Sequence, residues 1–550
     1  MPFKDQMRNS EGVCMSSFLI RGALVIDGSN REPFRGDIAI ENGMITDVSP
    51  FTKNGGKAAV EADGLVLAPG FIDIHSHTDL TIFKHPLAES KALQGVTTEV
   101  IGNCGIGAFP VNDERKAALI DYLKMHEFHL PSYGLSWNHF TQYADQLDRI
   151  GLGLNLAPLV AHGALRIAIL GAEDRFPSKK EFETMKNLLI DSLEQGAWGL
   201  STGLIYPPGS FAKTEELVDL ARIVADHGAI YTSHIRGEGA TLMEALDEAI
   251  CIGKKSGVRV EVSHLKAMGK DNWGRGKEAL LKLEKARQEG VDIAADQYPY
   301  EATSTSLTAL VPQWAQAGGV SELLKRLASP ETEERLQMEI LREIDKRGGP
   351  SRIVIAGIGS AKNIELSGKN VSQIAALWNC PPEIAVMRVL REEKAAVGAV
   401  YFSLSGEDVA AILSSDQVSV GSDGMGMNAE EDLGKSTHPR SYGTFPRILG
   451  LYAREKGTLS MAKAIHKMTG LVAGRVGLKN RGFIQPGFMA DLVLFDPMTI
   501  QDRSTFEHPH QYAAGVVYTW VNGCPIVQEG RITGNTPGRV LRKREVSSYG

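Results

Sequence analysis

Cysteine is scarce in this sequence, and its few cysteines form no regular pattern. The 550-residue chain has five, an odd number at scattered positions: Cys14, Cys104, Cys251, Cys380 and Cys524. Secreted disulfide scaffolds are short chains with an even number of closely spaced cysteines. The pattern therefore argues against a disulfide framework and favours a reducing compartment, so we expect a cytoplasmic protein.

Long apolar runs and basic blocks are also missing. No stretch has the length or purity of a membrane-spanning helix, and residues 1–14 are polar and lack the apolar core of a signal peptide. The net charge is −7, and only the short tail 539–544 is rich in Lys and Arg. These absences exclude the usual signatures of nucleic-acid and membrane partners, and they leave the oligomeric state open.

The composition is that of an ordinary globular protein, with 43% hydrophobic and 23% charged residues. A chain of this length is too long for one compact core. In its middle, β-rich runs alternate with helical patterns, which is typical of an α/β (β/α)8 TIM-like barrel. The eight predicted strands are residues 71–75, 97–102, 153–160, 197–202, 229–233, 259–263, 292–298 and 418–422.

Both ends of the chain have a different character from the middle. Short β-runs separated by turn signals occupy residues 18–69 and return in residues 480–540. They predict a small β-sandwich domain built from both ends around a barrel of residues 70–300 and 400–479. Residues 1–17 are predicted to be poorly ordered.

The seventh and eighth predicted strands are separated by about 120 residues, far more than one connecting helix needs. An insertion subdomain is therefore expected at residues 301–399. The insertion follows the seventh strand, so it begins at the carboxyl-terminal face of the barrel, where the active site lies. It is therefore a candidate to shape the active site. A peripheral appendage with no role is the alternative.

Residues able to bind metal follow several predicted strands. His75 and His77 end the first strand, and alternation along a strand places both on one face. Cys104, His234, His264 and Asp423 follow the second, fifth, sixth and eighth strands. Because the active site of such a barrel lies at the carboxyl ends of its strands, these side chains are expected to converge into a set suited to zinc.

Each of these residues also has a structural explanation when it is taken alone. His75 and His77 could be a polar strand end, and Cys104 could be a small buried hydrophobe. His234 and His264 could be core histidines with satisfied hydrogen bonds, and Asp423 could cap a helix. Their recurrence at equivalent strand ends is what favours a site.

The HxH strand, the single histidines and the late aspartate resemble the amidohydrolase superfamily. Five motifs are more narrowly similar to the D-aminoacylase, or N-acyl-D-amino-acid deacylase, family from about Phe18 onward: Gly102-Asn-Cys-Gly-Ile-Gly107, Ser201-Thr-Gly-Leu-Ile-Tyr-Pro-Pro-Gly209, Ser263-His-Leu-Lys266, Tyr298-Pro-Tyr300 and Gly421-Ser-Asp-Gly424. The fourth strand lacks the metal-bridging lysine that many amidohydrolases are expected to place there. The resemblance implies that Cys104 replaces it.

By that resemblance, Cys104, His234 and His264 hold a tightly bound zinc. His75 and His77, sharing Cys104, form a second and weaker site. The implied reaction is hydrolysis of the amide bond of N-acyl-D-amino acids, giving a carboxylate and a free D-amino acid. Asp423 is the expected general base and acid.

A substrate with a free carboxylate needs a cation near the metal. Lys266 has that position, because it lies two residues beyond His264 on the same strand face. The resemblance adds Tyr298 and Ser304 as carboxylate partners, and a preference for the D form is implied by it alone. A solvent-exposed strand end is the structural alternative for Lys266.

Three other functions compete with this reading. A cyclic-amide hydrolase of the hydantoinase or dihydroorotase type is disfavoured by the missing lysine and by Cys104. A zinc-dependent deaminase on the same barrel would also use histidine ligands and a late aspartate. A non-enzymatic scaffold is disfavoured because the candidate ligands are all present.

Overall fold

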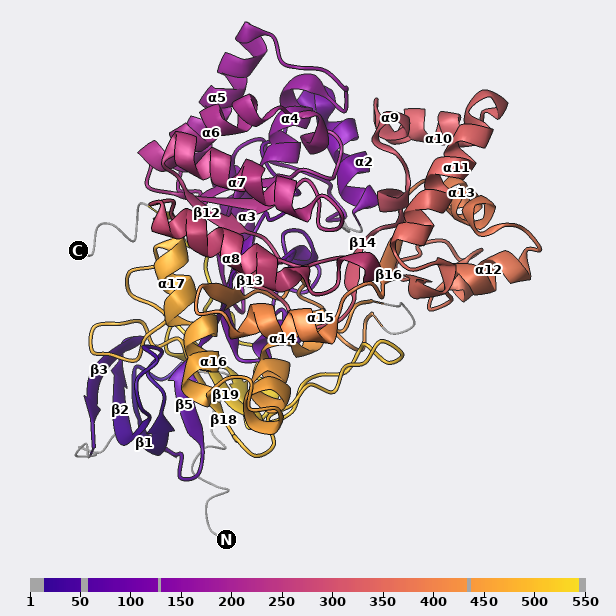
Figure 1. The fold of residues 1–550 in the computed structure, drawn as a ribbon. Helices are drawn as coiled ribbons and strands as arrows, with labels where there is room; N and C mark the ends of the chain where they lie inside the picture. Colours follow the sequence, from indigo (N-terminus) through magenta and orange to yellow (C-terminus); the bar gives the residue numbers. More distant parts are fainter. Residues whose placement is uncertain (1–13, 51–57, 127–129, 433–436, 544–550) are drawn as a thin grey trace.

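Eight parallel strand positions form the centre of the computed structural model, which describes residues 14–50, 58–126, 130–432 and 437–543 (Figure 1). Each strand coincides with a run predicted from the sequence. In chain order they are β6 (Phe71–Asp73), β7 (Val96–Ile101), β8 (Asn155–Pro158) with its continuation β9 (Val160–Ala161), β10 (Gly199–Gly203), β11 (Ile230–His234), β12 (Arg259–Val262), β13 (Ile293–Gln297) and β17 (Val418–Val420).

The strands form two parallel sheets that meet at two seams. One sheet has the order β6-β7-β8 and the other β17-β13-β12-β11-β10-β9, and only one residue separates β8 from β9. At the other seam, Ser76 and Gly424 form a parallel bridge. The Asp423 amide there donates to the His75 carbonyl at 2.7 Å. The first and eighth strands are therefore neighbours, and the predicted TIM-like barrel is confirmed.

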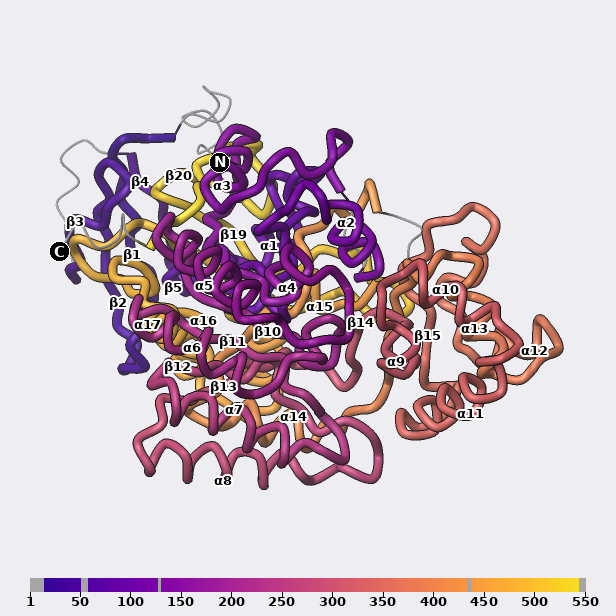
Figure 2. Tube along the Cα trace, turned by 90° about the horizontal axis from the view of Figure 1, so that it is seen from above, coloured from indigo at the N-terminus to yellow at the C-terminus, as the bar shows by residue number. Residues whose placement is uncertain are grey.

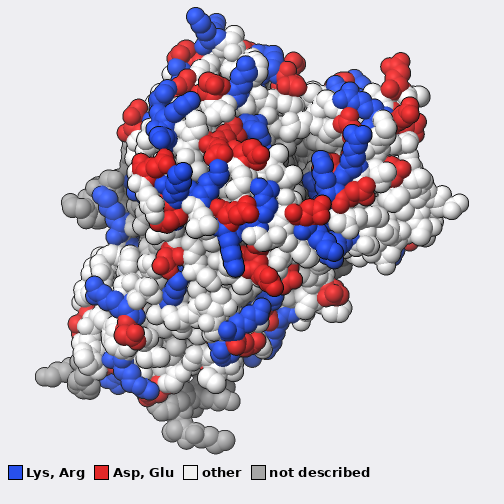
Figure 3. Space-filling model, in the orientation of Figure 1, with Lys and Arg blue, Asp and Glu red and all other residues white. Residues whose placement is uncertain are grey.

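Helices cover the outside of this barrel (Figures 1 and 2). Helix α5 (Lys179–Glu194) shows why they form: Ser178 and Glu181 make a capping box at its start, and Met185, Leu189 and Leu193 recur on its buried face. No helix in the described ranges is long and apolar enough to cross a membrane. Acidic and basic side chains are mixed over the face drawn in Figure 3.

The two ends of the chain share one nine-stranded sheet, drawn indigo and yellow in Figure 1. Its core contains Phe18 and Trp520, whose rings stack at 5.8 Å although two strands separate β1 from β19 in the sheet. The sheet therefore curls over its own core. Its strands are β1 (Ser17–Val25), β2 (Phe34–Glu41), β3 (Met44–Ser49), β4 (Ala58–Glu61), β5 (Val66–Pro69), β18 (Leu492–Phe495), β19 (Val516–Val521), β20 (Cys524–Gln528) and β21 (Arg531–Ile532).

The structure departs from the cysteine-based expectation at one pair. Cys14 and Cys524 form a disulfide across 510 residues of sequence, while Cys104, Cys251 and Cys380 are free. Spacing could not reveal this pair, because the shared sheet alone brings the two chain ends together. Residues 1–13 of the segment predicted to be poorly ordered lie outside the described residues.

The segment between β13 and β17 contains a subdomain that projects to one side of the barrel (Figure 2). Its antiparallel sheet has the order β14 (Thr303–Ser306), β16 (Gly398–Tyr401) and β15 (Ile353–Ile355), of which the sequence indicated only β15. A separate apolar core includes Leu336, Ile340, Ile344 and Leu390. Its main helices are α10 (Val320–Ala328), α11 (Pro330–Lys346), α12 (Val371–Leu377) and α13 (Pro382–Glu392).

A buried lysine links three barrel strands beneath the site. Lys91, in α1 (Glu89–Ala92), lies 2.7 Å from Asp73 Oδ2, 2.6 Å from Ser422 Oγ and 3.1 Å from Glu99 Oε1. All four side chains are fully buried. Glu99 also accepts a hydrogen bond of 2.6 Å from Ser76 Oγ. This cluster holds the ends of β6, β7 and β17 together where the candidate ligands begin.

Replacing Lys91 should therefore destabilise the barrel strongly. Lys91→Met leaves Asp73 and Glu99 buried without their cation, and removing one partner of a buried pair costs roughly 3–5 kcal/mol. The free energy of unfolding in urea measures this. Lys325→Met is the control, because its bridge to Glu322 is solvent-exposed and such pairs are worth about 1 kcal/mol at most. Equal losses in the two variants would contradict the role of Lys91.

Candidate metal centre

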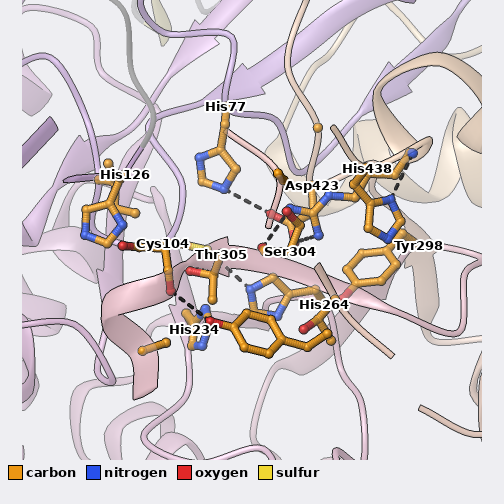
Figure 4. Close-up of a pocket in the computed structure, with 18 of the residues that line it drawn as sticks. His77, Cys104, His126, His234, His264, Tyr298, Ser304, Thr305, Asp423 and His438 are labelled. Atoms are coloured by element: carbon orange, nitrogen blue, oxygen red, sulfur yellow. Dashed lines mark hydrogen bonds and ion pairs between the residues drawn. The ribbon is translucent and has the colours of Figure 1, made fainter. Parts of the chain in front are cut away.

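The barrel brings the five predicted metal ligands and the predicted catalytic Asp423 to one buried place, and Figure 4 labels all of them except His75. His75 and His77 both follow β6, and each of the other four follows or ends a strand of its own. None of the six is more than 8% exposed. Figure 4 shows Asp423, His438 and Tyr298 on one side of the cavity and His126 on the other. The six are His75, His77, Cys104, His234, His264 and Asp423.

Cys104 is the common neighbour of two of these imidazoles. Its Sγ lies 3.2 Å from His75 Nε2 and 3.3 Å from His264 Nε2. Cys104 has a φ of +55°, in a tight turn next to Gly105. A Cβ on Gly105 would come within 2.6 Å of the Gly203 nitrogen. The glycines around Cys104 therefore let its loop approach the fourth strand closely.

The surroundings favour a thiolate at Cys104. Burial by itself raises the pKa of the thiol, but the positive charges of His75 and His264 lower this pKa well below its usual range. A thiolate is the form of cysteine that binds metal. Metal-binding imidazoles are neutral, so a bound cation would displace the protons of His75 and His264 and itself compensate the thiolate.

The donor atoms fit a soft divalent metal such as zinc. One nitrogen, sulfur or oxygen from each of His75, Cys104, His264 and Asp423 lies within 4.8 Å of the others, and so do donors of His234, Glu238 and His264. Ligand atoms around a tetrahedral zinc lie about 3.5 Å apart, close to the two separations at Cys104. Neither ring nitrogen of His234 has a hydrogen-bond partner among the described residues.

Asp296, which the sequence analysis missed, orients one candidate ligand from behind. It is buried at the end of β13, and its Oδ2 lies 3.3 Å from His75 Nδ1. Its Oδ1 also accepts a 2.9 Å hydrogen bond from the His264 backbone amide. A carboxylate on Nδ1 leaves Nε2 available toward Cys104, the usual arrangement for a histidine that binds metal.

Asp423 faces the centre as an ionised carboxylate. Its Oδ1 lies 3.0 Å from His77 Nε2, and its Oδ2 accepts a hydrogen bond of 2.6 Å from the Arg440 guanidinium. Burial by itself would raise the pKa of Asp423, but Arg440 and His264 hold this pKa well below its usual range. One oxygen is therefore fixed by Arg440 while the other faces the candidate ligands.

The three predicted substrate-binding residues line the same cavity, which has a volume of about 110 Å³. Lys266 Nζ lies 5.6 Å from the centre of the Tyr298 ring, and the Arg440 guanidinium lies 5.0 Å from it. The Tyr298 hydroxyl has no hydrogen-bond partner in the described part of the chain. Ser304 contributes its carbonyl, which accepts a 3.1 Å hydrogen bond from Arg440. Two cations and a hydroxyl thus meet at one end of the cavity.

Arg440 and Glu238 were missed because neither directly ends a strand. Arg440 begins α15 (Arg440–Arg447), and its backbone amide donates to His438 Nδ1 at 3.0 Å. Glu238 comes four residues after His234, a spacing that could have drawn attention to it, and it lies 2.5 Å from Lys266 Nζ. Both side chains line the cavity.

Two further buried histidines differ in their relation to the cavity. His162 lies away from the cavity, and its Nε2 lies 2.9 Å from Glu216 Oε1. His126 lines the cavity and packs its ring 4.7 Å from that of Tyr206. Burial and the charge of His77 lower the pKa of His126 to about 3, so it is neutral.

Comparisons with known proteins agree with this geometry. The amidohydrolase family model matches residues 58–355 and 402–527. A D-aminoacylase of Alcaligenes xylosoxydans xylosoxydans is 35% identical, covering 96% of this chain and 97% of its own. An N-acyl-D-aspartate deacylase of the same organism is 34% identical, covering 98% and 97%.

A solved structure is similar over the same length. It is the N-acyl-D-glutamate deacylase of Bordetella bronchiseptica, complexed with zinc and a phosphonate that mimics the tetrahedral intermediate. Its TM-score is 0.79 at 33% identity, with 96% of this chain and 99% of that one covered. Fold, candidate centre and full-length relatives agree, and the chain belongs to the D-aminoacylase, or N-acyl-D-amino-acid deacylase, family of the amidohydrolases.

Proposed function

We propose that the protein is a zinc-dependent deacylase that hydrolyses the amide bond of N-acyl-D-amino acids. The observation that carries this proposal is the buried Cys104 between two imidazoles, with the ionised Asp423 beside them. The relatives named above act on N-acyl-D-amino acids, which supports the same small-molecule substrate class and the D configuration here.

The zinc ligands are proposed to divide into two sets. Cys104, His234 and His264 hold the tightly bound ion, and His75 and His77 share Cys104 in a weaker second site. When bound, zinc supplies a Lewis acid that activates water and polarises a carbonyl oxygen. The free nitrogens of His234 support its place in the tighter set.

Asp423 is proposed as the general base and then the general acid. Because Arg440 fixes Oδ2, the carboxylate presents Oδ1 toward His77 and the centre of the cavity. Oδ1 takes a proton from the attacking water and then delivers it to the nitrogen of the departing amine. A single carboxylate thus serves both halves of the hydrolysis.

The charged end of the cavity is proposed to bind the substrate carboxylate. Lys266, Tyr298 and Ser304 are the predicted partners, and Arg440 joins them because its guanidinium lies 5.0 Å from the centre of the Tyr298 ring. A carboxylate held there leaves the amide carbonyl to reach toward Cys104 and His264. Binding at both points orients the bond to be cleaved.

A cyclic-amide hydrolase is the nearest alternative enzyme, and the residues of strand β10 argue against this function. Residues 199–203 of that strand contain no lysine to bridge two metals. Cys104, which approaches the same strand through Gly105 and Gly203, is proposed to take that place. The relatives at full length are deacylases of linear amides.

We propose that each region of the chain has a distinct part in this function. Residues 18–69 and 480–540 form the β-domain, 70–300 and 400–479 carry the catalytic barrel, and 301–399 complete the cavity. The Cys14–Cys524 disulfide fits an oxidising compartment, whereas Cys104 must stay reduced to bind metal. The cytoplasmic location is proposed on the second ground alone. Residues 1–17 are assigned no part in the reaction.

A substrate screen with metal analysis tests the function. Purified protein, dialysed extensively, should retain about one zinc per chain and hydrolyse N-acetyl-D-amino acids but not their L forms, because the L form would exchange the positions of two substituents on the α-carbon. Turnover is followed as released amine, with hydantoins as comparison substrates. Activity in a metal-free sample, or turnover of hydantoins alone, would exclude the proposal.

Replacement of Asp423 tests the chemical step. Asp423→Asn keeps the shape of the side chain but removes its base, so kcat should fall by roughly 10²–10⁴-fold while zinc content is unchanged. Asp416→Asn is the control, because Asp416 pairs with Lys463 on the surface. If Asp423→Asn kept normal turnover, Asp423 could not be the general base.

A further inference from the structure

The cavity has a second wall, formed jointly by the barrel and the insertion, that carries one more cation. Arg347 follows α11 directly and is only 8% exposed, yet its side chain lines the cavity. Ile205, Met268 and Ala309 line the cavity beside it and have no charge. These four residues also line a neighbouring cavity of about 660 Å³. Beyond this wall there is therefore room for a substituent of the substrate.

The charge of Arg347 is already neutralised. Its guanidinium donates to Glu343 Oε2 at 2.6 Å and to the Ala309 carbonyl at 3.0 Å. It also lies 5.3 Å from the centre of the Tyr401 ring. Burial by itself would raise the pKa of Glu343, but Arg347 and Lys346 lower it, so Glu343 is a carboxylate.

This wall differs from the end of the cavity that holds Lys266 and Arg440. There, Lys266 and Arg440 are also paired, with Glu238 and Asp423, but the Tyr298 hydroxyl between them has no partner among the described residues and can donate to a carboxylate. Here, Arg347 shares Glu343 with the solvent-exposed Lys346, and the apolar side chains of Ile205, Met268 and Ala309 offer no such donor. A second carboxylate on the substrate would lose its hydration, meet an arginine already paired, and be repelled by Glu343.

We infer, on the basis of the proposed deacylase function, that the wall of Ile205, Met268, Ala309 and Arg347 receives the amino-acid side chain and that Glu343 selects uncharged apolar side chains over acidic ones. Glu343 acts through Arg347 and does not need to touch the substrate. The inference separates this chain from relatives named for D-aspartate and D-glutamate.

Glu343→Gln tests the inference because it removes the carboxylate that pairs with Arg347 and leaves the positive charge of Arg347 in place. The wild-type protein should prefer N-acetyl-D-leucine to N-acetyl-D-glutamate in kcat/KM. The amide can still accept a hydrogen bond from Arg347, so the wall keeps its shape. The variant should raise kcat/KM for the glutamate substrate about ten-fold relative to leucine, because an uncompensated cation now faces the side chain.

Two further variants control this experiment. Glu322→Gln removes the same charge from an exposed bridge to Lys325 on the insertion, and it should leave the ratio unchanged. Arg347→Met removes the cation but keeps Glu343, which retains Lys346 at 2.6 Å. In that variant the kcat/KM for N-acetyl-D-glutamate, relative to that for N-acetyl-D-leucine, should be lower than in the wild-type protein. It gives an independent test if Glu343→Gln does not fold.

Three results would overturn the inference. One is a wild-type protein that prefers N-acetyl-D-glutamate, and another is a Glu343→Gln variant whose ratio matches that of Glu322→Gln. The third is an Arg347→Met variant whose kcat/KM for N-acetyl-D-glutamate, relative to N-acetyl-D-leucine, is higher than that of the wild-type protein. Each of these requires turnover of N-acyl-D-amino acids, whereas absence of all such turnover would refute the deacylase function itself.

Discussion

A buried negative charge at Cys104 is the constraint on which the rest of the site depends. A thiolate with 2% exposure is costly unless positive charge lies close to it. Parallel strands meet at their carboxyl ends and place His75 and His264 within 3.3 Å of the sulfur. These imidazoles either carry the positive charge themselves or, in the neutral form, hold a zinc ion that carries it. The glycine-bounded turn supplies the close approach. Asp296 then orients His75 from the far side.

The same need for compensation organises the remaining walls of the cavity. Three carboxylates line it or lie just behind it, and each has its own cation: Asp423 with Arg440 at 2.6 Å, Glu238 with Lys266 at 2.5 Å, and Glu343 with Arg347 at 2.6 Å. Pairs of this kind fix side-chain orientation even where they add little net stability. Their positions divide the cavity into the three parts that we propose bind the substrate carboxylate, carry out the reaction and receive the side chain.

The sequence was sufficient to predict the elements whose signals are local. The barrel strands followed from residue patterns, and the candidate ligands followed from their place at strand ends. Asp296 could not be found in that way, because it contacts His75 across 221 residues of sequence. Arg440 and Arg347 lie at or next to the ends of helices, and only the fold brings them to the cavity. The Cys14–Cys524 disulfide was missed for the same reason: only the folded sheet brings positions 510 residues apart together. Strands β14 and β16 are short and pair across most of the insertion, which local pattern does not indicate.

The central claim is that Cys104 holds the catalytic zinc. X-ray absorption at the zinc edge, on protein containing one zinc per chain, tests this claim most directly. The account predicts one sulfur together with imidazole nitrogens in the first coordination shell, and loss of the sulfur signal in Cys104→Ser. A shell of nitrogen and oxygen alone in the wild-type protein would contradict it.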